Sequence, residues 1–136
     1  MAEDSLRVLV SNEYCRVVHD PRTNIARFTR TSAPIQSLED AARYFGEAIA
    51  ALDALGRARI RLIIDSREAP MKNDPQYETA MAEHRRQVAR GIPRVAVIVK
   101  TAVGRLHAQR LGKEDHLQQV VVGTDEEALA YLTRAE

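Results

Sequence analysis

The stretch RLIIDSREAPMKNDPQY, residues 61–77, indicates the fold more clearly than any other part of the chain. Three consecutive aliphatic residues lead to Asp65 and Ser66, a polar loop follows, and Asp74 then precedes Pro75. An aliphatic run bounded by polar residues favours a strand. An Asp before a Pro is typical of a helix N-cap and the first helical position. The stretch therefore predicts a strand, a loop and a helix, the unit from which α/β folds are built.

Strand and helix patterns continue to alternate downstream. The expected segments are a strand at 59–65, a helix at 74–90, a strand at 94–100, a helix at 101–112, a strand at 117–122 and a helix at 124–132. The segment 94–100 is almost continuously apolar, which is typical of a central parallel strand covered on both faces. The helix at 101–112 carries Val103 and Leu106 and is expected to stop at Gly112. The last helix begins with a capping box, Thr124 to Glu127.

Upstream, the pattern is typical of strands at 6–11, 15–20 and 25–29. The connector HDPRTN at 19–24 suits a hairpin, because Pro fixes one turn dihedral and Asn tolerates positive φ. A helix is expected from its cap at Ser37 to Gly56. The order βββαβαβαβα predicts one α/β domain over residues 1–136. Its mixed sheet has an N-terminal antiparallel hairpin and parallel core strands, packed against about four helices.

Composition narrows the classes of function. The chain has 136 residues, enough for one domain with a full core. Twenty basic and 19 acidic residues leave a net charge of +1, and aromatic residues make up 4%, so a nucleic-acid partner is not expected. The single Cys15 cannot form an internal disulfide, and the acidic start is unlike a signal peptide. With no apolar run long enough to cross a bilayer, we expect a cytoplasmic protein without a transmembrane segment.

The element order, the strand ending at Asp65, the RVAVIV segment at 94–99 and the terminal DEEALAYL at 125–132 together resemble the SpoIIAA-like branch of the STAS superfamily. The resemblance implies a single STAS-like domain, related in fold to anti-sigma-factor antagonists and CRAL-TRIO lipid-binding domains, in a bacterial cytoplasm. In the antagonists, a kinase phosphorylates a serine at the start of the helix after this strand. Here that start is NDPQ, residues 73–76, which holds no Ser or Thr. The resemblance therefore implies a binding surface around Asn73, Asp74 and the following helix, without the phosphoserine switch.

Asp65 and Ser66 lie where a parallel strand delivers residues to the carboxyl edge of a sheet, the usual place for ligands in open α/β folds. One interpretation makes Ser66 a phosphate acceptor or Asp65 a ligand anchor. The other has Asp65 end the strand by accepting hydrogen bonds from loop amides. No GxSxG motif surrounds Ser66, so a serine nucleophile has no local signature.

The helix at 74–90 carries the remaining candidates. Tyr77, Met81, His84 and Val88 recur at three- and four-residue spacing, which places His84 on the apolar face. We expect His84 to be a partly buried residue bonded to a backbone carbonyl, or else a pocket-lining residue together with Tyr77. Arg85 and Arg86 belong to a charged face that is either solvated or binds an acidic partner. The spacing of His and Cys shows no metal-site pattern, and the glycines stand singly, so no metal or cofactor is predicted.

Three hypotheses follow. The preferred one is a non-enzymatic regulatory module that binds a protein partner through the 74–90 helix and the loop before it. The alternative is a carrier or sensor of a small apolar or lipid-like ligand, held between the sheet and that helix. The third is an enzyme using Asp65, Ser66 and His84, which requires these side chains to converge. A homodimer through the hairpin's edge strand is also open, unless arginines at 16, 27 and 30 blunt that edge.

Overall fold

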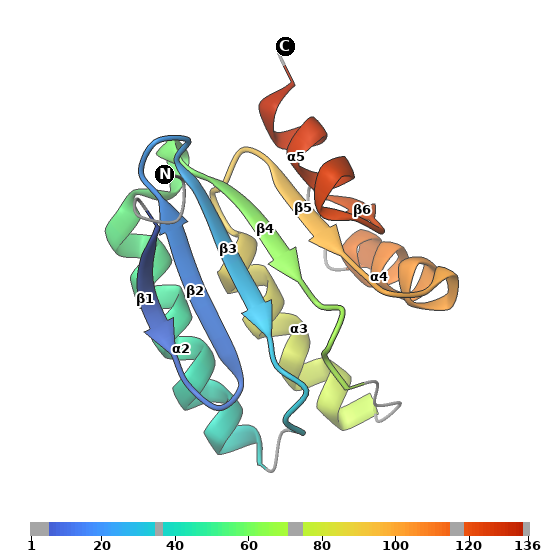
Figure 1. Cartoon of the computed structure of the whole chain (residues 1–136). Coiled ribbons are helices and arrows are strands. Elements are labelled where there is room, and N and C mark those ends of the chain that lie inside the picture. The colour runs from blue at the N-terminus through green and yellow to red at the C-terminus, as the bar shows by residue number, and fades with distance from the viewer. Residues whose placement is uncertain (1–5, 35–36, 71–74, 115–118, 135–136) are drawn as a thin grey trace.

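The computed structural model of the chain describes residues 6–34, 37–70, 75–114 and 119–134, without the side chains of residues 77, 78, 107, 111, 112 and 114. The elements are β1 (Arg7–Ser11), β2 (Cys15–Asp20), β3 (Ile25–Arg30), α2 (Leu38–Leu55), the 3-10 helix η1 (Arg57–Arg59), β4 (Arg61–Asp65), α3 (Pro75–Ala89), β5 (Val95–Ile98), α4 (Ala102–Glu114), β6 (Val120–Val122) and α5 (Asp125–Thr133). Apart from η1, this is the predicted order (Figure 1).

The six strands form one sheet in the order β1-β2-β3-β4-β5-β6. β1, β2 and β3 pair antiparallel, and β3 to β6 pair parallel. The predicted mixed sheet is therefore confirmed. Asn24 closes the β2–β3 turn at a φ of 58°, a left-handed conformation that Asn adopts more readily than most residues.

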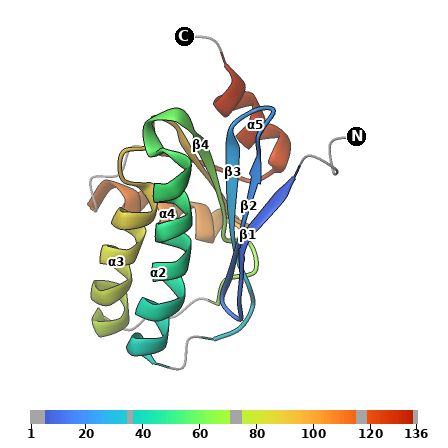
Figure 2. The same ribbon diagram turned by 90° about the vertical axis from the view of Figure 1, so that its left-hand side faces the viewer.

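The helices cover the two faces of the sheet unequally. α2, α3 and α4 all contribute to one hydrophobic core, through residues such as Phe45, Met81 and Ala108. This is the expected result of successive right-handed crossovers that advance in one direction across the sheet. The opposite face carries α5, whose Ala128 and Leu132 pack on β3, β4 and β5 in a second core. Figure 2 shows α2 and α3 side by side on one side of the sheet, away from α5.

β5 has all four residues buried because it lies between these two cores. Val95 and Val97 point to the core under α2 and α3, and Ala96 and Ile98 point to α5. The strand is thus covered on both faces, as its continuous apolar sequence predicted.

Local signals placed most helix ends correctly. The Ser37 hydroxyl accepts a hydrogen bond from the Asp40 N–H at 3.0 Å at the start of α2. Gly56 and Gly91 follow α2 and α3 with positive φ, as glycines after helices commonly do. The stop expected at Gly112 is wrong, because α4 continues to Glu114. A single glycine inside a helix costs only about 1 kcal/mol relative to alanine, so it does not by itself end the helix.

Two other expectations need correction. The strand expected from residue 59 begins at Arg61, because η1 occupies the residues directly after Gly56. The arginines expected to blunt the hairpin's edge lie on interior strands, Arg16 on β2 and both Arg27 and Arg30 on β3. The outer strand of the antiparallel part is β1, and spacing along the sequence could not reveal which of its strands would lie at the edge. Within the described ranges, no helix is long and apolar enough to span a membrane.

Candidate functional site

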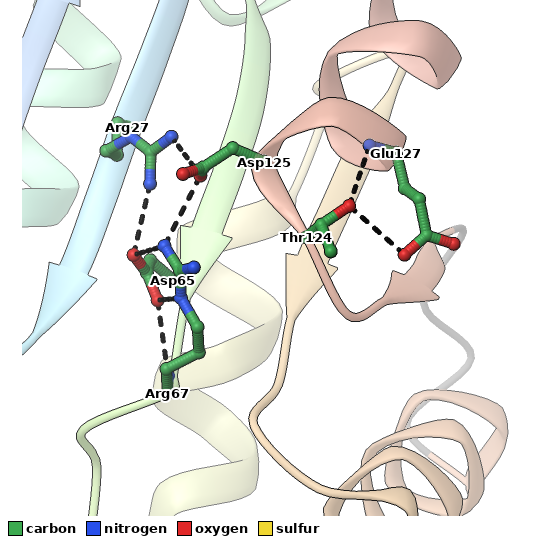
Figure 3. Close-up of polar contacts among 6 residues, drawn as sticks. All are labelled: Arg27, Asp65, Arg67, Thr124, Asp125 and Glu127. Carbon is green, nitrogen blue, oxygen red and sulfur yellow. Dashed lines mark hydrogen bonds and ion pairs between the residues drawn. The ribbon is translucent and has the colours of Figure 1, made fainter.

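Asp65 ends β4 on the face of the sheet that α5 covers, with only 8% of its surface exposed. Arg67 donates to both carboxylate oxygens, from Nε to Oδ1 at 2.9 Å and from Nη2 to Oδ2 at 2.7 Å. The Arg67 backbone N–H bonds Oδ1 at 3.2 Å, and Arg27 Nη1 bonds Oδ2 at 3.1 Å. The predicted bond to a loop amide is present, but two arginine side chains dominate the surroundings of this carboxylate (Figure 3).

A second carboxylate completes the group. Asp125, the first residue of α5, accepts hydrogen bonds from Arg27 Nη2 at 2.7 Å and from Arg67 Nη2 at 3.3 Å. We call Arg27, Asp65, Arg67 and Asp125 the arginine–aspartate cluster. It joins β3, the end of β4, the loop after it and the start of α5 (Figure 3).

The charges in the cluster stabilise one another. The hydrogen bonds from Arg67 are the main reason that the pKa of Asp65 lies below its usual range, although burial opposes the shift. The hydrogen bond from Arg27 likewise lowers the pKa of Asp125, and Asp65 raises the pKa of Arg67. A carboxylate held ionised in this way is a poor proton carrier near neutral pH, because a general acid or base works best with a pKa near the working pH.

Contacts at both ends hold α5 in place, and the ion pair of Asp125 with Arg27 is one of them. At the N-terminus of the helix, the Thr124 hydroxyl accepts from the Glu127 N–H at 3.1 Å and donates to Glu127 Oε1 at 3.2 Å (Figure 3). Glu127 Oε1 also accepts from the Gly123 N–H at 3.2 Å. At the other end, buried Arg94 donates from Nη1 to the carbonyls of Tyr131 at 2.9 Å and Arg134 at 2.5 Å. A nine-residue helix is marginal alone, so these contacts at both ends account for its position.

Ser66 directly follows Asp65 and continues the ladder of β4. Its N–H donates to the Ile98 carbonyl at 2.9 Å, and its own carbonyl accepts from the Ala69 N–H at 3.2 Å. The half-buried Ser66 is thus placed by backbone bonds at the carboxyl edge of the sheet, where the sequence predicted it.

His84 lies on the other side of the sheet. Its ring stacks on Phe45 of α2, with centroids 5.4 Å apart and an interplanar angle of 27°. Burial lowers the pKa of this half-buried imidazole. The prediction of an inward-facing histidine is confirmed, although its observed contact is an aromatic stack and not a bond to a carbonyl. Because Asp65 faces α5 while His84 packs between α3 and α2, these two groups do not converge as the enzyme hypothesis requires.

The charged face of α3 is internally paired. Arg86 Nη2 lies 2.7 Å from Glu83 Oε2, and Gln87 Nε2 donates to Glu83 Oε1 at 3.1 Å. Arg85 is half-buried. Of the other predicted site residues, Asn73 and Asp74 lie outside the described residues, as does the side chain of Tyr77.

The sequence interpretation missed an apolar surface on α4. Val103 is 71% exposed and Leu106 is 67% exposed, while Ala108 packs inward. Arg110 and Lys113, both exposed, follow at positions that keep the same face of the helix outward. We call Val103, Leu106, Arg110 and Lys113 the α4 stripe. Its signal was present in the spacing i, i+3, i+7, i+10, but spacing identifies a face without saying whether it is buried.

Within the part of the chain that the structure describes, no three His, Cys, Asp or Glu side chains gather to hold a metal ion. Comparison of the chain with protein-family models, with curated proteins and with solved structures gives no significant match in any of the three. The STAS-like resemblance therefore remains an interpretation of the sequence pattern.

Proposed function

We propose that this chain is a non-enzymatic regulatory module of the STAS-like type that acts by binding a protein partner, with the α4 stripe as the contact surface. The observation that carries the proposal is the exposure of Val103 and Leu106, one turn apart on the same helix. Burying a large aliphatic side chain contributes about 1.5–3 kcal/mol, so two such residues supply a useful part of the affinity of a modest complex.

The chemistry of the stripe indicates the kind of partner. Arg110 and Lys113 continue the same exposed face and place two cations beside the apolar pair. A complementary surface has an apolar hollow rimmed by carboxylates, since opposite charge accelerates encounter and fixes orientation. A protein partner of this type is therefore favoured over a neutral or basic one.

The arginine–aspartate cluster supports a binding role over a catalytic one. Asp65 is one of the three residues that the enzyme hypothesis uses, and both its oxygens accept hydrogen bonds from arginine. Its carboxylate orders α5 and the sheet edge. A cytoplasmic location remains part of the proposal.

Two expectations from the sequence stay predictions. One, the contact that the sequence favoured, is the α3 helix with Arg85 and Arg86, together with the loop before it. The other is an apolar ligand between the sheet and α3, where Met81 and Val88 are buried in the core. Neither has an observation that raises it above the α4 stripe.

Affinity capture from extract of the native cell tests the proposal. We expect the wild-type chain to retain a protein that the double variant Val103→Glu, Leu106→Glu loses, while Arg85→Glu, Arg86→Glu retains it. Thermal unfolding must show that both variants are folded. If only the α3 variant loses the protein, the proposal that α4 forms the contact is contradicted. If the chain captures no protein but sediments with anionic lipid vesicles, its partner is a membrane surface instead.

A further inference from the structure

The face of the sheet that carries α5 is only partly covered by the described elements. A helix of nine residues is about 14 Å long and about 10 Å wide, whereas six strands spaced about 4.8 Å apart span about 24 Å. α5 packs on β4 and β5, and Figure 1 shows β1 and β2 with α2 behind them and no helix in front. The open half of this face, over β1 and β2, belongs to the antiparallel part of the sheet, where a solvated face is common but normally carries polar side chains.

Apolar side chains occupy this open half. On β2, Cys15 and Val17 are buried under α2, so strand alternation puts Arg16 and Val18 on the open side. Val8 of β1 lies opposite Val18 and is 53% exposed. Leu6, two residues before Val8, is 44% exposed. Leu6, Val8 and Val18 therefore form an apolar floor, with the exposed cation of Arg16 on the same face.

α5 forms a wall beside this floor. Asp125 reaches toward β3 through its ion pair with Arg27, which identifies the flank of α5 that faces the open half. Leu129, four residues later, lies on the same flank and is 42% exposed. The outer surface of α5 presents Glu126 and the small Ala130, both exposed.

We infer that a second copy of this chain covers the open half, with α5 of each protomer lying over β1 and β2 of its partner about a two-fold axis. A two-fold interface must be self-complementary, and this surface carries both halves of the match. One half of the match is the apolar floor of Leu6, Val8 and Val18, which no described helix of the same chain covers. The other half is α5, whose Leu129 is only partly buried. Charge agrees as well, because Arg16 lies on the floor and Glu126 on the outside of α5.

This dimer differs from one made by pairing edge strands. β1 has a register shift between Val8 and Val10, which interrupts its ladder with β2. Bulges of this kind are a recognised device against edge-to-edge pairing. Face-to-face packing needs no regular edge, and it uses a surface distinct from the α4 stripe.

Sedimentation velocity over a concentration series tests the inference. We expect wild-type chain to form a dimer, and Val8→Lys and Leu129→Lys each to weaken it roughly tenfold or more, as expected for central interface residues. Val103→Lys, at a valine of α4 that is 71% exposed against 53% for Val8, is the control and should leave dimerisation unchanged. Arg16→Glu and Glu126→Arg should each weaken the dimer, and the double variant should recover it.

A wild-type chain that stays monomeric throughout the series overturns the inference, as does a dimer that both folded lysine variants retain. The inference is also overturned if the chain stays monomeric and uses Val8 to bind a different protein, because that protein and not a second copy would then cover the open half. Unfolding curves separate loss of the dimer from loss of the fold. Since binding through the α4 stripe is measured with Val103 and Leu106 variants, failure of one proposal is distinguishable from failure of the other.

Discussion

Arg67 binds the Asp65 carboxylate with two parallel side-chain hydrogen bonds, at 2.9 Å and 2.7 Å, although the two residues are only two positions apart. The two-pronged geometry matches the planar guanidinium to the carboxylate and gives a directional, charge-assisted contact. Arg27 approaches from β3 and connects the same carboxylate to the rest of the sheet. Because Arg27 and Arg67 also bind Asp125, they connect the end of β4 to the start of α5.

Asp65→Asn should destabilise the fold by about 1–3 kcal/mol, because two partly buried arginines lose their charged acceptor. Urea unfolding monitored by circular dichroism measures this change. Glu83→Gln is the matched control, since both side chains of the Glu83–Arg86 pair on α3 are about half exposed, at 55% and 46%, and its loss should have little effect on stability. Equal effects of the two substitutions would show that the cluster adds nothing to stability.

The cluster should also make stability fall in acid. Asp65 and Asp125 have pKa values lowered in the folded chain, so unfolded chain binds protons first as the pH falls. Their contribution is fully present above the unfolded pKa of about 3.9 and is lost as the pH falls through the lower folded-state values. The free-energy difference between wild type and the Asp65→Asn, Asp125→Asn variant should shrink over that window. A difference independent of pH would contradict this account.

His84 should titrate below the ordinary histidine pKa of about 6.5, because its ring is buried against Phe45. NMR titration of the imidazole measures it directly. Since the folded-state pKa is lowered, this contribution to stability is present above pH 6.5 and is lost as the pH falls toward the folded-state value. Phe45→Leu should open the site and move the pKa back toward 6.5. A His84 pKa at or above 6.5 in wild type would be incompatible with the stacked, desolvated ring.

Arg94→Met should loosen the C-terminal end of α5. The substitution keeps the apolar stem but removes the donor to the Tyr131 and Arg134 carbonyls. We expect amides of α5 to exchange roughly tenfold faster, the result of about 1.4 kcal/mol of lost local stability. Hydrogen exchange with mass spectrometry resolves this, with exposed Arg61→Met on β4 as the control. Uniform acceleration across α2 and α5 would indicate global destabilisation and not release of one helix.

Much of the fold could be predicted because its signals are local. The buried run of β5, the caps at Ser37 and Thr124 and the turn at Asn24 each depend on a few neighbouring residues. The start of β4 was misplaced because the residues after Gly56 form a 3-10 turn that resembles extended chain in composition.

The site was harder to predict because it depends on the assembled sheet. Arg27 and Asp125 are 98 positions apart and meet only after β3 pairs with β4 and α5 packs across them. The α4 stripe could not be predicted from the sequence for another reason. Val103 and Leu106 have core-like spacing, and only the packing of Ala108 inward shows that they face outward.

The proposed protein contact is tested most directly by photocrosslinking in the native cell. The photoreactive residue benzoylphenylalanine is placed at Leu106 on the α4 stripe, or at Arg86 on α3 as the control for the earlier prediction. We predict a discrete protein adduct from position 106 and none of that mass from position 86. Adducts from position 86 alone, or no protein adduct from position 106 in folded chain, would contradict the claim that α4 binds the partner.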